Sequence, residues 1–141
     1  MKSIGELSSP VSLPATGGNF VLVVDDEAAV RRFATRVLER EGYVVIEARD
    51  GVEALEVIRD GVTTFEVVVS DIVMPRLNGV ELMQALFTSH PGLPVILVSG
   101  YATGALAELG IAAPCAILPK PFLSERLLEE VRRCAGQRDR K

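Results

Sequence analysis

Short runs of apolar residues alternate with amphipathic stretches from residue 20 to near the end of the chain. The runs are rich in Val, Ile and Leu and lack a regular polar alternation, which is typical of strands covered on both faces. They predict strands at 20–24, 44–48, 66–70, 95–99 and 115–118. The second run contains Glu47, and a charge inside a strand favours a place at the edge of the sheet.

The stretches between the runs repeat apolar residues every three or four positions, which is the period of one helix face. The first stretch carries a stripe formed by Val30, Phe33, Ala34, Val37 and Leu38. Further helices are predicted at about 51–60, 79–89, 102–109 and 123–135. Their expected inward-facing residues are Ala54, Leu55, Ile58, Leu82, Met83, Leu86, Phe87, Leu127, Leu128 and Val131. The helix at 102–109 should be weakly held, because small residues and glycine dominate it.

Strands that alternate with helices predict an α/β fold, in which a parallel sheet carries helices on both faces. Right-handed crossovers restrict the topology further, and we expect a doubly wound flavodoxin-like (βα)5 sheet with strand order 2-1-3-4-5. The folded domain should span residues 19–136. Residues 1–18 are rich in Ser, Pro and Gly and predict a flexible leader or linker. Residues 137–141 form a short basic tail.

The composition argues against several classes of partner. The chain has 141 residues, a net charge of −4 and no block of Lys or Arg in the predicted domain, so direct binding of nucleic acid is not expected. No apolar run approaches the length of a membrane span, and no signal peptide is visible, so we expect a cytoplasmic protein. The cysteines, Cys115 and Cys134, have no motif partner and are expected to be reduced thiols that pack in the core.

Polar chemistry follows four of the five predicted strands. The first strand ends in Asp25-Asp26, the third in Asp71 and the fourth in Ser99, and the fifth runs into Lys120. The carboxyl ends of parallel strands lie at one rim of the sheet. If the first and third strands are neighbours, three carboxylates crowd together and need a cation to neutralise them. All-oxygen ligands favour a hard ion, and Mg²⁺ fits best.

This arrangement would give Asp71 a chemical role. A carboxylate can attack phosphorus and carry the phosphoryl group as an acyl phosphate. The metal and Lys120 would neutralise charge on the phosphoryl oxygens, and Ser99 could donate a hydrogen bond to them. Taken singly, each of these residues has an ordinary explanation as a helix cap, a turn residue or a surface charge. Their conjunction at successive strand ends favours the functional interpretation.

Four segments of the chain resemble the response-regulator receiver domains of two-component signalling. They are "VLVVDDE" (21–27), "SDIVMPRLNG" (70–79), "VILVSGYA" (95–102) and "LPKPF" (118–122). Their order and spacing both match the family, and the resemblance covers about residues 20–136. It implies a phosphoacceptor domain rather than an enzyme. It also implies that the donor is a histidine kinase or a histidine phosphotransfer domain, and that a downstream protein partner reads the result.

The resemblance also assigns roles to the metal ligands. It implies that Asp71 is the phosphoacceptor, that Asp26 binds Mg²⁺ directly and that Asp25 binds it through water. The backbone carbonyl of Val73, two positions past the acceptor, would be the third protein ligand.

Two further roles concern the phosphoryl group. Ser99 takes the position of the hydroxyl that follows the phosphoryl group. Lys120 pairs with the acceptor, and the family usually has a cis bond at the position that corresponds to Lys120-Pro121. The wording "SGYA" (99–102) is similar to receivers attached to hybrid histidine kinases, so the chain could be such a module or a free-standing receiver.

Two departures from the family pattern affect the expected behaviour. Receivers usually place Tyr or Phe three residues before the lysine, and this chain has Ile117 there. An isoleucine cannot swing between buried and exposed rotamers as a ring does, so the usual aromatic readout is in doubt. Val73 and Tyr101 occupy positions that tune loss of the phosphoryl group, and neither can orient a water as an acid or amide would. We therefore expect a long-lived phosphoryl state.

Three alternative functions have less support in the sequence than this hypothesis. A phosphatase of the haloacid dehalogenase type needs a second Asp two residues after its nucleophile, where this chain has Glu27 or Ala28. A flavin- or nucleotide-binding domain lacks support because no Gly-rich phosphate loop follows the first strand. A pseudo-receiver that binds partners without phosphorylation would be expected to lose an acid or the lysine; all are present, but Ile117 leaves this alternative open.

Overall fold

The computed structural model describes residues 19–100 and 113–139. The strands are β2 (Phe20–Val24), β3 (Val44–Ala48), β4 (Val67–Asp71), β5 (Val95–Ser99) and β6 (Ala116–Pro119). The helices are α1 (Ala28–Arg40), α2 (Gly51–Asp60), α3 (Gly79–Ser89) and α5 (Ser124–Asp139). Three strands match their predicted bounds, whereas β4 and β6 lie one residue later than expected. The helix expected at 102–109 lies outside the described residues.

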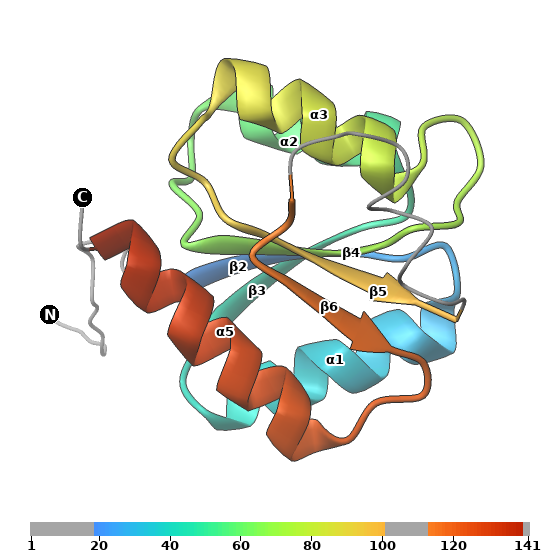
Figure 1. Cartoon of the computed structure of the whole chain (residues 1–141), viewed down its shortest axis with the longest axis vertical. Coiled ribbons are helices and arrows are strands. Elements are labelled where there is room, and N and C mark those ends of the chain that lie inside the picture. The colour runs from blue at the N-terminus through green and yellow to red at the C-terminus, as the bar shows by residue number, and fades with distance from the viewer. Residues whose placement is uncertain (1–18, 101–112, 140–141) are drawn as a thin grey trace, which may run out of the picture.

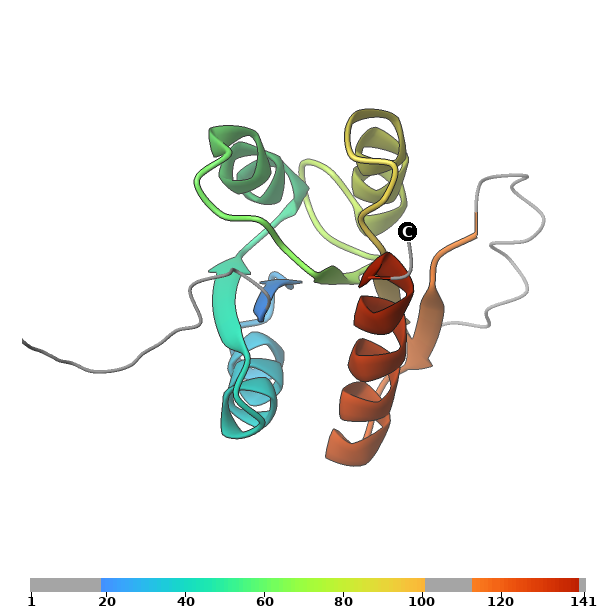
Figure 2. The ribbon, with the colours of Figure 1, turned by 90° about the vertical axis from the view of Figure 1, so that its left-hand side faces the viewer.

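All five strands are parallel, and they lie in the order β3-β2-β4-β5-β6. In chain order this is 2-1-3-4-5, which confirms the predicted flavodoxin-like topology. Helices α2 and α3 cover one face of the sheet, and α1 and α5 cover the other (Figure 1). The view turned by a right angle shows the same two layers of helices on either side of the strands (Figure 2). Strand β3 lies at one edge, as Glu47 predicted.

Two hydrophobic cores hold these layers together, one on each face of the sheet. Alternate residues of one strand serve different cores, so Leu22 packs under α2 and α3 while Val21 and Val23 pack under α1 and α5. Such two-sided burial explains the continuous apolar runs in the sequence. The strands β4 and β5 are buried along their whole length.

Two aromatic residues that were expected to face inward are instead exposed. Phe33 of α1 is 41% exposed, and its ring lies 5.8 Å from the ring of Phe122. Phe87 is 59% exposed near the end of α3. The helical period predicts which residues share a face, but it does not say how far the neighbouring layer extends, and both rings lie beyond the covered part of their stripe.

The expectation of reduced thiols was wrong for this structure, because Cys115 and Cys134 form a disulfide. Helix α5 runs back along the sheet, so its last turns return to the start of β6 (Figure 1). This brings together two residues separated by 19 positions, with their Cα atoms 6.1 Å apart. No short motif encodes such a pairing, since it depends on the packing of α5. The same helix ends at Asp139, four residues beyond the predicted end at about residue 135.

None of the helices in the described parts of the chain is both long enough and apolar enough to cross a membrane.

Candidate functional site

Three carboxylates meet at the carboxyl ends of β2 and β4. Asp71 is the last residue of β4, and Asp25 follows the end of the neighbouring strand β2. Each of these two residues is less than a tenth exposed, whereas Asp26 is open to solvent. One oxygen from each of Asp25, Asp26 and Asp71 can be chosen so that all three lie within 4.8 Å of one another. The crowding predicted from strand order is therefore present.

Lys120 reaches into this cluster from the loop after β6. Its Nζ atom lies 3.3 Å from Asp71 Oδ2 and 3.5 Å from Asp25 Oδ2. A third carboxylate, that of Glu27, lies 3.6 Å from the same atom. The bond from Lys120 to Pro121 is cis, as the resemblance implied. Lys120 is thus the counter-ion of the two buried acids, and Glu27 is a partner that sequence reasoning did not identify.

The charges of the cluster are strongly coupled. Burial raises the pKa of Asp71, the negative charge of Asp25 raises it further, and the attraction of Lys120 only partly offsets both. Burial also raises the pKa of Asp25, against the hydrogen bond from the Glu27 backbone and the attraction of Lys120. For Lys120, burial lowers the pKa, but the attraction of Asp25 and Asp71 outweighs burial, and the pKa is raised. The site therefore has an excess of negative charge that one ammonium does not neutralise.

This chemistry fits a divalent cation with oxygen ligands. Carboxylate oxygens at such short separation repel one another unless a cation lies between them, and Mg²⁺ takes one or two carboxylates together with waters. Val73 lies two positions past Asp71 with its side chain exposed, in the loop where the third ligand was expected. The residues present are thus suited to hold a magnesium ion at this rim.

Ser99 lies beside the cluster at the end of the next strand. It is the last residue of β5 and is buried, and its backbone carbonyl accepts a hydrogen bond of 2.8 Å from the Lys120 amide. The structure therefore brings Ser99 and Lys120 together at the end of adjacent strands. All five residues singled out from the strand ends lie at the same rim of the sheet.

The loop after Asp71 is held at a fixed distance from β4 by a glycine. The amide of Gly79 donates a hydrogen bond of 2.9 Å to the carbonyl of Ile72, which closes the loop. A Cβ atom at position 79 would clash with the Asp71 carbonyl and lie 2.9 Å from the Ile72 Cα. Asn78 then starts α3 with a capping box, in which Asn78 and Glu81 bond each other's backbone amides. The Asn-Gly pair thus fixes where the loop ends.

A half-buried cation, Arg31, supports the β2–α1 loop, and sequence reasoning did not identify it. The guanidinium of Arg31 donates a hydrogen bond of 2.7 Å to the backbone carbonyl of Asp25. It also pairs with Glu47 on β3 at 2.9 Å, and the other oxygen of Glu47 accepts a hydrogen bond from Thr35. The sequence does contain a signal for this contact, because a charged residue in a strand, Glu47, needs a partner as well as a place at the sheet edge.

The position of the missing aromatic lies in the middle of β6. Ile117 is half-buried and lies beside Leu97 of β5 in the parallel register. Tyr101, the other residue named for its effect on the phosphoryl group, lies outside the described residues.

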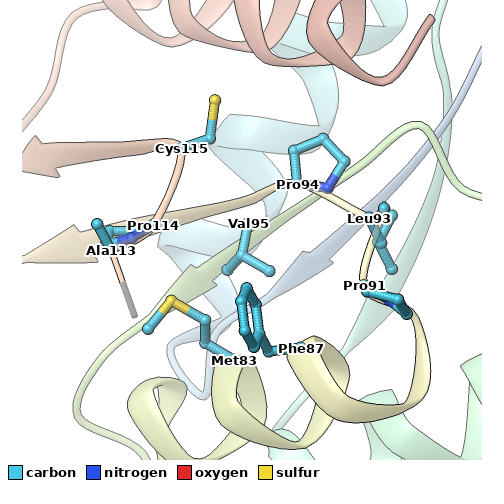
Figure 3. Close-up of a pocket in the computed structure, with 10 residues that line it drawn as sticks. Met83, Phe87, Pro91, Leu93, Pro94, Val95, Ala113, Pro114 and Cys115 are labelled. Atoms are coloured by element: carbon cyan, nitrogen blue, oxygen red, sulfur yellow. The ribbon is translucent and has the colours of Figure 1, made fainter. Parts of the chain in front are cut away.

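A separate hollow of about 440 Å³ lies at the opposite end of the sheet. Figure 3 shows Met83 and Phe87 of α3 on one side of it and Ala113, Pro114 and Cys115 on the other. Val95, the first residue of β5, forms part of its wall, whereas Ser99 at the far end of that strand belongs to the acidic rim. The hollow contains none of the residues of the acidic cluster.

Comparison with known proteins agrees with this geometry. Residues 21–132 match the family described as the response regulator receiver domain. The sensor kinase CckA of Brucella abortus (strain 2308) is 42% identical over 125 residues, which are 88% of this chain and 13% of that protein. The response regulator MprA of Mycobacterium sp. (strain KMS) is 39% identical over 113 residues, which are 79% of this chain and 48% of that protein. The chain spans less than half the length of these two relatives.

Solved structures include proteins of the same fold. The crystal structure of the response regulator protein TrrA from Thermotoga maritima, in complex with Mg²⁺ and BeF, has a TM-score of 0.74 and 29% identity. The match covers 82% of this chain and 98% of that one. The family match over residues 21–132 and the identity to CckA agree with the strand order and the acidic rim described above. The chain belongs to the response regulator receiver domain family of two-component signalling.

Proposed function

We propose that Asp71 accepts a phosphoryl group from the phosphohistidine of a histidine kinase or a histidine phosphotransfer domain. The observation that carries this proposal is the position of the Asp71 carboxylate, which lies among two other acids with Lys120 Nζ 3.3 Å from its Oδ2. An oxygen of Asp71 attacks phosphorus, the bond from phosphorus to the imidazole nitrogen breaks, and the imidazole leaves with that electron pair. The product is an acyl phosphate on Asp71.

The other residues have supporting roles in this proposal. Asp25, Asp26, Asp71 and the backbone carbonyl of Val73 would hold Mg²⁺, which supplies positive charge for the phosphoryl oxygens when bound. Lys120 supplies a second positive charge at the same place. Ser99, at the end of β5, donates its hydroxyl to the phosphoryl group once transfer has taken place.

Transfer of the phosphoryl group to Asp71 would change the protein surface around this rim of the sheet. The phosphoryl group adds about −1.5 to −2 charges at the rim, and Ser99 and Lys120 are drawn toward it. Ser99 ends β5 and Lys120 follows the neighbouring edge strand β6, so their movement would alter the loops there. A downstream protein partner reads that change, and the domain acts as a switch rather than as an enzyme with turnover. We place the receiver at residues 19–136 of a cytoplasmic protein, either free-standing or as a module of a hybrid kinase.

A direct test is phosphorylation by a small phosphodonor. The full chain is incubated with Mg²⁺ and acetyl phosphate, and intact mass is measured with and without EDTA. We expect the mass of one phosphoryl group to be gained only with Mg²⁺ present, and to be lost on treatment with hydroxylamine, which cleaves acyl phosphates. The Asp71→Asn variant should show no gain while keeping its circular dichroism spectrum.

Two outcomes would contradict the proposal in different ways. A gain of mass that persists in Asp71→Asn would remove Asp71 from its role. No gain in the wild-type chain, from acetyl phosphate or from a phosphorylated kinase, would favour the pseudo-receiver that Ile117 left open.

A further inference from the structure

An ion pair joins the loop after Asp71 to Asp50, the residue that caps the start of α2. Arg76 lies in this loop, and its Nε donates to Asp50 Oδ2 at 2.9 Å while its second guanidinium nitrogen donates to Oδ1 at 3.1 Å. This is the forked geometry in which arginine binds a carboxylate most firmly. The side chain of Asp50 is only 11% exposed, although that of Arg76 is mostly exposed. The hydrogen bonds from Arg76 lower the pKa of Asp50 below its usual value.

Both partners are also fixed by their backbone. Asp50 is the N-cap of α2, and its Oδ1 accepts a hydrogen bond of 2.9 Å from the Glu53 amide. Arg76 has a φ of 69°, a left-handed conformation that costs an ordinary side chain about 1–2 kcal/mol. Asn or Gly would adopt that conformation more readily, so the backbone does not explain an arginine at this position, whereas the ion pair with Asp50 does. Arg76 thus holds a specific acceptor from an otherwise unfavourable backbone position.

A second contact lies directly beside the ion pair. The Gly51 amide donates to the Leu77 carbonyl at 3.2 Å, and a Cβ atom at Gly51 would lie 2.5 Å from that same oxygen. The hydrogen bond from the Gly79 amide to the Ile72 carbonyl ties the start of the loop to its end. The segment between these two anchors contains Val73, so its path depends on both.

We propose that Asp50 and Arg76 are a positioning pair that restricts the loop of residues 72–78, so that the Val73 carbonyl is available as a ligand beside the carboxylates. The inference rests on the proposed function, because it concerns the Val73 carbonyl as a ligand of Mg²⁺. Neither residue touches the ion. Their effect is to reduce the number of loop conformations that must be lost when the metal binds.

The positioning role and simple electrostatics predict opposite changes in Mg²⁺ affinity when Arg76 is removed. If Arg76 acted only as a nearby positive charge, its removal would strengthen Mg²⁺ binding. If it positions the loop, its removal weakens binding. Asp50 and Arg76 would then have the same effect when removed, although their charges are opposite, and removing both would cost no more than removing either one.

The test uses the full chain and Mg²⁺ alone, measured by isothermal titration calorimetry. The variant Arg76→Asn keeps a residue that tolerates the left-handed conformation, and Asp50→Asn keeps a residue that caps a helix, so each removes the ion pair with little backbone change. We expect about tenfold weaker binding for each variant and for the double variant, which corresponds to about 1.4 kcal/mol. Arg76→Lys, which keeps the charge but loses the fork, should fall between these variants and the wild type.

The matched control is another ion pair that lies away from this loop. Arg132 pairs with Glu41 at 3.1 Å, and Arg132→Asn should leave Mg²⁺ binding unchanged. Hydrogen exchange in the metal-free protein gives a second readout, and amides of residues 72–78 should exchange faster in Arg76→Asn and Asp50→Asn. Unchanged or tighter Mg²⁺ binding in Arg76→Asn, or unchanged exchange in that loop, would overturn the inference. A wild-type chain that binds no Mg²⁺ would instead count against the proposed function, and the exchange measurement would then decide the positioning role alone.

Discussion

The Nζ atom of Lys120 lies 3.3 Å from Oδ2 of Asp71, although β5 lies between β4, which Asp71 ends, and β6, which Lys120 follows. The side chain of Lys120 crosses the end of β5 to reach the carboxylate. The same atom lies 3.5 Å from Asp25, so one ammonium serves two buried acids. A divalent cation that binds these carboxylates is therefore expected to compete with the lysine for the same oxygens.

Replacing Lys120 by Met should therefore have two opposite effects. The metal-free protein should lose about 1–3 kcal/mol of stability, which is less than the cost of breaking a fully buried pair because Lys120 is 22% exposed. Mg²⁺ should bind more tightly and restore much of the loss, because a competing cation has gone. Thermal unfolding with and without Mg²⁺ checks both effects, with Lys120→Arg as the variant that keeps the charge. Equal loss of stability in the two conditions would contradict the idea of competition.

The raised pKa values of Asp25 and Asp71 predict how stability depends on pH without metal. A folded state that holds protons more tightly than the unfolded chain becomes less stable as pH rises through the raised pKa. Asp71→Asn should thus be more stable than the wild type at neutral pH when Mg²⁺ is absent, and the difference should shrink at mildly acidic pH. Urea unfolding in EDTA at both pH values measures this. A wild type that is the more stable of the two at neutral pH in EDTA would contradict it.

Gly79 should not tolerate a methyl group. The added Cβ would meet backbone atoms of Asp71 and Ile72, which cannot rotate away as a side chain would. Gly79→Ala is expected to cost about 1–3 kcal/mol of stability and to weaken Mg²⁺ binding, because the displaced backbone belongs to the acceptor itself. The control is Gly92→Ala, where nothing lies within 4 Å of the added atom. The midpoints of denaturant unfolding compare the two variants. Equal midpoints would show that an added methyl group at position 79 does not clash with the backbone of Asp71 and Ile72.

The disulfide should contribute measurably to stability. A bridge that closes a loop of this length lowers the conformational entropy of the unfolded chain, which raises the free energy of unfolding by about 3 kcal/mol. A reducing agent should therefore lower the melting temperature of the wild type and leave that of Cys115→Ser/Cys134→Ser unchanged. Alkylation and mass measurement count the free thiols. Two free thiols in protein purified without reductant would show that the bond does not persist in solution.

The phosphoryl group on Asp71 should be long-lived. Val73 offers no acid or amide to orient an attacking water, and its side chain is exposed toward solvent. Intact mass after removal of the phosphodonor should show decay over minutes or longer with Mg²⁺ present. The variant Val73→Asn should decay several-fold faster, because it adds an amide at this position. A wild-type half-life of seconds would contradict the expectation.

The fold could be predicted from the sequence because burial on two faces leaves a distinctive pattern. The apolar runs gave the strands within one residue, and Glu47 alone placed β3 at the edge. The site followed from topology, since the order of strands puts Asp25 beside Asp71. These features depend on local sequence together with a general rule on parallel sheets.

The remaining features depend on contacts between distant segments. The disulfide requires α5 to pack back over β6, and no spacing rule signals this. The exposure of Phe33 and Phe87 depends on how far the neighbouring layers extend. The pair formed by Asp50 and Arg76 joins residues that the sequence separates by a strand and a helix, and each on its own resembles an ordinary cap or surface charge.

The edge strand β3 has a consequence for how the protein behaves at high concentration. Among the strands of residues 19–100 and 113–139, β3 pairs only with β2, and an edge of this kind offers backbone groups to a strand of another molecule, which can start aggregation. The charge of Glu47, anchored by Arg31 and Thr35, would have to be buried or displaced by any such addition. The same carboxylate that steadies the β2–α1 loop is therefore also expected to make such an extension of the sheet less favourable.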